Sequence, residues 1–280
     1  MHLIMILAAL AVAWWLRLTS TEPRGTWIQR WQRSLFLFLF PPLLLLMTAI
    51  AVLCMGTQGQ MLGLQTGWFS YVLTLSYLGI IGILCLKLAW EGWQSVRSAR
   101  NCPPLNLEGR QVRLLNTGAL FAAQIGFWQP ELVVSQGLLQ TLAPAYLETV
   151  LAHEQGHYYY RDTFWFFWLG WIRSCTAWLP NTDALWQELL VLRELRADQW
   201  AALQVDPLLL AESLLMVVST SPVCSEIFCA ALDSASSRDR LEERIDALLA
   251  QPKPMPKPSF QSWIWVFLAF LPLVTVLLHR

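Results

Sequence analysis

Two histidines lie four residues apart, with a glutamate between them, in the stretch His153-Glu154-Gln155-Gly156-His157. Residues four apart lie on one face of a helix, so two imidazoles at this spacing can hold one metal ion. A glutamate directly after the first histidine can take a proton from a metal-bound water. The pattern predicts a catalytic zinc site in which His153 and His157 are ligands and Glu154 is the general base.

A catalytic zinc site has three protein ligands and one open position. The other two of the four histidines lie at the ends of the printed sequence, so a carboxylate should complete the set. Glu194 and Asp198 are four apart and share a helix face, which is unfavourable unless a cation or donors lie between them. We expect Glu194 to bind the zinc and Asp198 to accept the N–H of a ligand histidine. The alternative is a solvated acidic face with two arginines alongside.

Hydrolysis of a peptide bond also needs a donor, in addition to the metal, for the developing oxyanion. No further internal histidine is available, so the candidates are tyrosines and arginines near the two motifs. Each of these side chains has an ordinary structural use as well, at a membrane interface or in a surface ion pair. The candidates are Tyr158, Tyr159, Tyr160, Arg161, Arg193 and Arg196, of which Tyr160, Arg161 and Arg193 are the leading ones.

The rest of the chain predicts a membrane protein. Hydrophobic residues make up 56% and charged residues 14%, and the apolar residues form long runs. The net charge is zero, which argues against direct binding of nucleic acid. Four runs are long enough to be membrane spans, with the lipid bilayer as their partner, and they cover residues 2–18, 35–55, 68–90 and 260–278.

Positive charge predicts the orientation of these spans. The loop at 19–34 carries three arginines, the loop at 56–67 carries no charge, and basic residues follow the third span. By the positive-inside rule, the N-terminus lies outside and everything between the third and the last span lies in the cytoplasm. The expected location is therefore the plasma membrane or an inner membrane, with the active site on the cytoplasmic side.

The order of these segments predicts an N-terminal membrane domain (1–95) followed by a metallopeptidase domain (96–250). Short β-rich runs at 111–116, 120–128 and 131–135 predict a small sheet, with an edge strand near 121–127 to which a substrate strand can add. Helices are expected after Pro144 and over 181–204, 207–218 and 238–249. A loop at 219–237, a proline-rich spacer at 251–259 and a C-terminal span at 260–280 complete the chain. The fold class is mainly α-helical, with a zincin-like α+β domain.

Residues 163–180 are apolar enough to resemble another span. If Glu194 is a ligand, however, it must lie on the same side of the membrane as His157. The roughly 14 residues before Glu194 reach only about 21 Å as a helix, which is too short to return through a core of about 30 Å. We therefore expect this segment to lie in the interface, to be re-entrant or to pack against the first spans, and not to cross.

The stretches HEQGH, RELRADQWA and RLEERIDALL resemble the membrane-integral gluzincin peptidases, whose pattern is H-E-x-x-H with a downstream E-x-x-x-D. Within them, residues 130–161 most resemble the BlaR/MecR-type antirepressor metallopeptidases. The resemblance covers about residues 100–250 and implies one Zn²⁺ per chain. It implies the same roles for His153, His157, Glu194, Glu154 and Asp198 as the spacing does.

The chain departs from that group in one respect, because only two residues follow the last span and no penicillin-binding sensor domain is expected. The other candidate branch contains the heat-shock membrane protease and the CAAX prenyl endopeptidase. Those proteins place more membrane chain between the motifs, whereas 36 residues (158–193) separate His157 from Glu194 here.

The resulting expectation is a membrane zinc endopeptidase that cuts a cytoplasmic or membrane-proximal protein, with a transcriptional repressor as the substrate that the resemblance implies. The alternatives are a heat-shock or CAAX-type protease in quality control and a non-catalytic zinc-binding regulator. Glu154 argues against the regulator, because a closed structural site needs no base. A transport protein has little support, because Lys87 is the only charged residue within the second and third spans, where it lies near an end.

Overall fold

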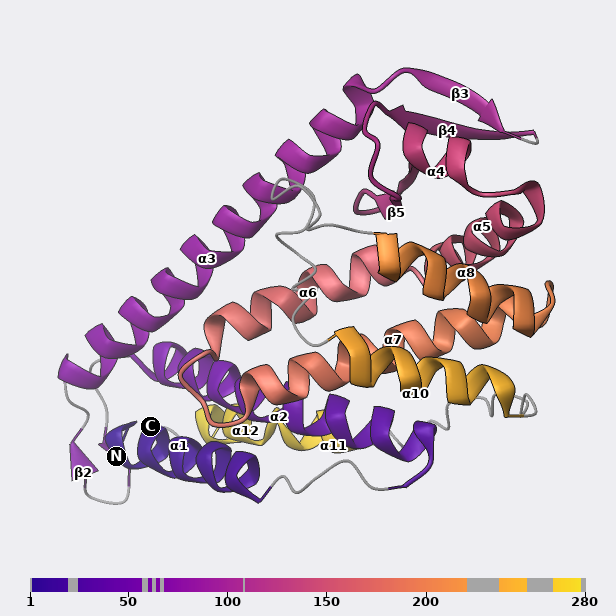
Figure 1. Cartoon of the computed structure of the whole chain (residues 1–280). Helices are drawn as coiled ribbons and strands as arrows, with labels where there is room; N and C mark the ends of the chain where they lie inside the picture. Colours follow the sequence, from indigo (N-terminus) through magenta and orange to yellow (C-terminus); the bar gives the residue numbers. More distant parts are fainter. Residues whose placement is uncertain are drawn as a thin grey trace. The chain divides into compact units, whose positions relative to one another are not determined.

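The computed structural model describes residues 2–19, 25–56, 60–61, 64–65, 68–107, 109–220, 237–250 and 264–277, and most of them are helical (Figure 1). The helices are α1 (His2–Leu18), α2 (Trp27–Met55), α3 (Trp68–Asn101), α4 (Gln136–Thr141), α5 (Pro144–Tyr159), α6 (Asp162–Cys175), α7 (Thr182–Ala201), α8 (Pro207–Thr220), α10 (Ser237–Leu249), α11 (Ile264–Leu268) and α12 (Leu271–Leu277). The strands are β1 (Gln60–Met61), β2 (Leu64–Gln65), β3 (Pro104–Leu107), β4 (Arg110–Leu115), β5 (Ala122–Ile125) and β6 (Glu131–Ser135).

The chain forms two compact units. The first consists of residues 1–87, 171–192 and 256–280, and the second of residues 88–170 and 193–255. Helices α3, α6 and α7 each contribute residues to both units. All the residues with predicted chemical roles belong to the second unit.

Apolar helices make up the first unit. Small residues of α1, Ala9 and Ala13, pack with Leu45 of α2, and α12 also packs against α2. The buried guanidinium of Arg17 donates to the backbone oxygen of Phe38 and to Thr182 Oγ1, at 3.4 and 3.3 Å. These contacts partly satisfy the buried guanidinium, the one arginine of α1.

Two helices of the described chain, α2 and α3, are long and apolar enough to cross a membrane. Only 11% of the most apolar window of α3 is buried. A core helix of a soluble protein would be largely buried, and a signal sequence would lie at the N-terminus, whereas α3 begins at Trp68. The small share of buried residues in α3 therefore favours a helix covered by lipid.

Three segments differ from their sequence-based description. Helix α2 begins at Trp27, eight residues before the predicted start, and continues through Pro41 and Pro42. The predicted last span consists of two short helices, α11 and α12, with Pro272 in the first turn of the second. The segment at 163–180 is helical only as far as Cys175. Its predicted failure to cross the membrane stays a prediction.

The second unit contains a four-stranded mixed sheet with the strand order β3-β4-β6-β5. The predicted strands over 111–116 and 131–135 are confirmed, and β5 lies at the edge, as expected. Strand β3 was not predicted. Parallel pairing of β4 with β6 and antiparallel pairing of β5 with β6 leave one side of β5 without a strand partner among the described residues.

The inner face of the sheet packs against α4 and α5 through a cluster of buried aliphatic side chains. Ser135 ends β6 and caps α4, because its hydroxyl accepts the backbone N–H groups of Leu138 and Phe121. Helix α5 starts with Pro144 in its first turn. The cluster comprises Val112, Leu120, Leu132, Val134, Leu138, Leu142, Leu147 and Leu151.

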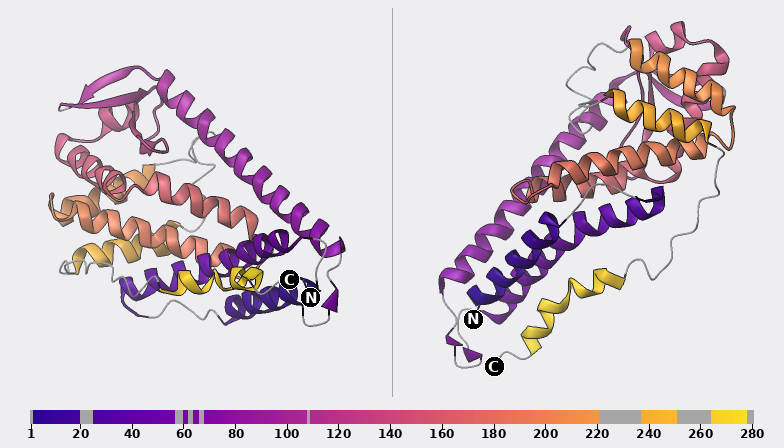
Figure 2. Two further views of the ribbon diagram at one scale, coloured as in Figure 1. Left: turned by 180° about the vertical axis from the view of Figure 1, so that it is seen from behind. Right: turned by 60° about the horizontal axis from the view of Figure 1, so that its bottom comes forward.

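Helix α8 packs against α5, and α10 packs in turn against α8, beside which it lies in the right-hand view of Figure 2. Leu210 and Ala211 of α8 pack with Leu248 of α10 and Ala201 of α7. These contacts bring α10 to the site, although it is far from α5 in the sequence. Of the predicted loop at 219–237, residues 219–220 belong to α8 and residue 237 to α10, and the rest lies outside the described residues, as does the proline-rich spacer at 251–259.

Candidate metal centre

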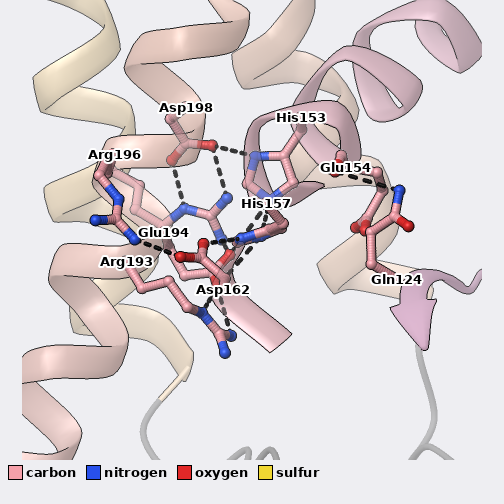
Figure 3. A network of polar contacts seen from close by, with 10 residues as sticks. Gln124, His153, Glu154, His157, Asp162, Arg193, Glu194, Arg196 and Asp198 are labelled. Atoms are coloured by element: carbon pink, nitrogen blue, oxygen red, sulfur yellow. Dashed lines mark hydrogen bonds and ion pairs between the residues drawn. The ribbon is translucent and has the colours of Figure 1, made fainter. Parts of the chain in front are cut away.

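Helix α5 places the two histidines so that their Nε2 atoms are 3.1 Å apart (Figure 3). Glu194 reaches the same point from α7, with Oε2 at 3.3 Å from His153 Nε2 and Oε1 at 3.6 Å from His157 Nε2. One ligand atom from each of the three residues lies within 4.8 Å of the others. The structure therefore brings together the three side chains that the sequence predicts as ligands.

These distances suit a tetrahedral zinc ion. Ligand atoms at 2.0–2.1 Å from zinc and at tetrahedral angles lie about 3.3 Å from one another, and the three observed separations scatter around that value. Both imidazoles direct Nδ1 at a carboxylate, so in the neutral form that binds a metal the N–H is on Nδ1 and the lone pair on Nε2. Two lone pairs and a carboxylate that face one point are the donor set of a divalent cation.

Charge around the point also favours a cation. Burial lowers the pKa of His153, but Asp198 and Glu194 outweigh burial and raise it to about 10. Burial raises the pKa of Glu194, but Arg193 and the two histidines hold it well below its usual value, so the carboxylate is ionised. The carboxylates around this point outnumber the arginines, so further positive charge at the imidazoles is favoured. A zinc ion bound to the imidazoles would supply that positive charge.

Asp198 positions His153 and is itself held by an arginine. Its Oδ1 lies 2.8 Å from His153 Nδ1, at ion-pair distance although the N–H is not well aligned with the oxygen. Arg244 of α10 donates to both carboxylate oxygens, from Nε to Oδ2 at 2.6 Å and from Nη2 to Oδ1 at 2.8 Å. The Asp198 side chain is only 1% exposed, so this pair is shielded from water.

Asp162 has the corresponding position at the second histidine. Its Oδ2 lies 2.7 Å from His157 Nδ1, and Arg196 of α7 donates to its other oxygen. Each imidazole therefore has an aspartate at Nδ1, and each aspartate has an arginine. Sequence reasoning missed Asp162 and Arg244. Arg244 lies in the stretch RLEERIDALL and Asp162 directly follows residues 130–161, but no spacing rule assigns either of them a partner.

Gly156 explains how the two helices come so close. A Cβ at this position would lie 3.1 Å from Ala197 Cα and 3.2 Å from the Ala197 backbone oxygen. A side chain there would push α7 away from α5. Glycine inside the histidine motif thus lets Glu194 and Asp198 reach the imidazoles on the facing helix.

Comparison with known proteins agrees with this geometry. Residues 104–186 match the sequence model of a family described as Peptidase family M48. The chain is similar to M48 metallopeptidases. The matched region contains the histidine motif and ends before Glu194. The comparisons with curated proteins and with solved structures found no match. The BlaR/MecR-type specialisation stays a prediction.

The M48-like region places Glu154 next to the ligands and away from solvent. The residue is 8% exposed, and burial raises the pKa of its carboxyl group, although both histidines oppose the shift. Gln124 of the edge strand donates its amide N–H to the Glu154 backbone oxygen at 3.5 Å. A carboxylate with a raised pKa is a stronger base, as general acid–base catalysis near neutral pH requires.

A cavity of about 150 Å³ adjoins Glu154 and His153. It lies among β5, α4, α5, α8 and α10, and its walls are mainly aliphatic. The size and the lining of the cavity suit one apolar group. The remaining lining residues are Ala122, Leu138, Val150, Leu210, Ser213, Leu214, Val217 and Arg244.

The structure gives the leading oxyanion candidates other partners. Arg193 donates twice to Glu194 Oε1, at 3.0 and 2.7 Å, and Arg196 lies over the ring of Tyr160, with Cζ 4.3 Å from its centroid. Arg161 lies over the ring of Trp128 at 5.3 Å. Tyr158 and Tyr159 are exposed. The assignment of an oxyanion donor stays a prediction.

Proposed function

We propose that this protein is a membrane-bound zinc endopeptidase that hydrolyses peptide bonds of a cytoplasmic or membrane-proximal protein. The observation that carries the proposal is the convergence of His153, His157 and Glu194 on one point, with Glu154 beside them at the wall of a cavity. Zinc held by these three residues would supply a Lewis acid, which acidifies water and polarises a carbonyl group.

The residues of the chain have separate tasks in this reaction. Glu154 takes the proton of the attacking water and passes it to the departing amine. Asp198 and Asp162 fix the orientation of the imidazoles through Nδ1. The edge of β5 aligns the substrate backbone, and the cavity accepts one apolar side chain next to the scissile bond.

The membrane location rests on the exposed apolar surface of α3 and on the distribution of charge. The positive-inside rule places the site on the cytoplasmic side. The family resemblance suggests a transcriptional repressor as the substrate. Cleavage of misassembled membrane proteins or of prenylated proteins is the alternative within the same chemistry, and a zinc-binding regulator without catalysis is the alternative outside it.

The test compares Glu154→Gln with Glu148→Gln, since both glutamates lie on α5 and Glu148 is exposed. The full chain is reconstituted in nanodiscs, and its zinc content and its cleavage of a fluorogenic peptide library are measured. We expect one zinc per chain in all three proteins. Cleavage should fall by about 10²–10⁴-fold in Glu154→Gln only, because a general base contributes a factor of that size.

Three results would contradict the proposal in different ways. If the wild-type protein binds no zinc, the proposed metal centre is wrong. If Glu154→Gln cleaves as fast as the wild type, Glu154 is not the general base. Zinc-loaded wild-type protein that cleaves no peptide in the library would favour the non-catalytic regulator.

A further inference from the structure

An exposed cluster of aromatic side chains lies next to the edge strand β5 of the sheet in the second unit. Phe127 and Trp128, in the turn between β5 and β6, contact rings of the first two turns of α6. The centroid of Phe127 is 5.0 Å from those of Phe164 and Phe167, and that of Trp128 is 5.4 Å from that of Phe164. The rings are not a core, because Trp128 and Trp165 are 63% and 57% exposed. Phe127 is 40% and Trp168 36% exposed.

The cluster has the composition of a membrane-interface anchor. Tryptophan rings favour the headgroup level of a bilayer, and an adjacent arginine can pair with lipid phosphates. Arg161 is exposed and lies over the ring of Trp128 at 5.3 Å. Isolated exposed apolar residues need no explanation, but a contiguous set of large rings indicates an interaction surface.

A second place in the same unit has the same construction. Trp90 and Trp93 of α3 have ring centroids 5.1 Å apart and are 58% and 49% exposed. Arg97 lies over the Trp93 ring at 5.3 Å. This group lies where the apolar part of α3, a candidate span, changes to polar sequence. If α3 crosses the membrane, as proposed above, this pair of exposed tryptophans with a stacked arginine lies at the end of the span.

The chain directly after the aromatic cluster contacts the apolar part of that candidate span. In the first unit, Trp171 of α6 donates its indole N–H to the Ile81 backbone oxygen of α3 at 3.0 Å. The neighbouring Ile80 and Ile83 are 57% and 67% exposed. Trp168 precedes Trp171 by one helical turn. This continuity favours lipid over a protein partner as the occupant of the aromatic surface.

We propose that Phe127, Trp128, Trp165 and Trp168 form a lipid-contacting surface that lies in the interfacial region of the bilayer. Trp128 follows Ile125, the last residue of β5, by three residues, which span about 10 Å when extended. The edge strand therefore lies close to the membrane surface. If the proposed function holds, the substrate is a chain segment that reaches β5 along that surface.

Spin-label depth measurements test the lipid contact in the full chain. The six native cysteines are replaced by serine, and a nitroxide is attached at Trp165→Cys or, as the control, at Leu203→Cys. Leu203 is an apolar residue of the same unit that is 76% exposed and lies outside the cluster. Each protein is placed alone in a nanodisc of phosphatidylcholine and phosphatidylglycerol. Collisions with oxygen and with a water-soluble nickel chelate are then compared.

We expect the label at position 165 to favour oxygen and the label at position 203 to favour the nickel chelate. If the labels at both positions favour the nickel chelate equally, the proposal is wrong, and the aromatic surface is instead a binding site for a soluble protein. A label at 165 that neither reagent reaches would assign it to packing within the protein. This readout needs neither zinc nor cleavage, so repeating it in Glu154→Gln separates its failure from failure of the proposed function.

The consequence for substrates has its own test. A cleavable peptide is presented either free in solution or tethered by a short linker to a lipid anchor in the nanodisc. We expect Trp128→Ser/Trp165→Ser to cleave the free peptide at the wild-type rate and to lose the preference for the tethered one. An unchanged preference would overturn the placement of β5 at the membrane surface.

Discussion

Replacing Arg244 by methionine tests whether the zinc site depends on a side chain from α10. In the wild type this arginine makes two charge-assisted hydrogen bonds, of 2.6 and 2.8 Å, to the carboxylate of Asp198. Its side chain is 14% exposed and that of Asp198 is 1% exposed. Methionine keeps much of the aliphatic volume and removes the charge and the donors.

The magnitude follows from the burial of the pair. Removing one partner of a buried ion pair costs about 3–5 kcal/mol, because the other charge stays buried without compensation. Asp198 also faces His153 Nδ1 at 2.8 Å. Loss of an anchored carboxylate behind a ligand histidine typically lowers metal affinity by about 10–100-fold. Arg244→Met should therefore lower both thermal stability and zinc affinity.

Zinc affinity is measured by competition with a chromophoric chelator, and stability by thermal unfolding of the zinc-free protein. Arg240→Met, one turn earlier on α10, is the matched control for loss of a positive charge. The double variant Asp198→Asn/Arg244→Met removes both charges, so it should recover most of the stability while zinc affinity stays low. A single Arg244→Met variant that binds zinc as tightly as Arg240→Met would refute the assigned role of the pair.

Two further substitutions probe the cavity and the helix contact. Leu214→Trp should fill the cavity and lower kcat/KM for peptides with a large apolar side chain by about 10-fold or more relative to alanine peptides. An unchanged ratio, or the same loss in the exposed neighbour Leu215→Trp, would contradict it. Gly156→Ala should weaken zinc binding and cost about 1–3 kcal/mol, because the new Cβ meets Ala197 at 3.1 Å. Gly92→Ala on α3 meets no atom within 4 Å and should stabilise by up to about 1 kcal/mol, as alanine does in a helix, so equal melting of both alanine variants would contradict the close approach.

Local pattern was sufficient to predict the elements that carry the ligands. The four-residue spacing of the histidines and of Glu194 and Asp198 predicted two helix faces that need a common cation, and the structure places those faces against each other. The β-rich run over 131–135 predicted β6 at its observed bounds. In both cases the information lies within a few residues, as helical spacing for the ligand helices and as β-rich composition for the strand.

Strand β3 was missed because it begins at Pro104, and proline usually argues against a strand. An edge position tolerates it, since an edge residue has no partner for its N–H on one side. Asp162 and Arg244 were missed for a different reason. Arg244 reaches Asp198 only because α10 packs on α8. Asp162 lies five residues after His157, and the tight turn between α5 and α6, where Arg161 has φ 54°, brings it back to the imidazole.

X-ray absorption at the zinc edge tests the central claim most directly, because it reports the atoms bound to the metal in the full-length protein. With His153, His157 and Glu194 as ligands, the nearest atoms should be nitrogen and oxygen at about 2.0–2.2 Å, with scattering from two imidazole rings. Sulfur at about 2.3 Å, from any of the six cysteines, or scattering from fewer than two imidazoles would contradict the proposed centre.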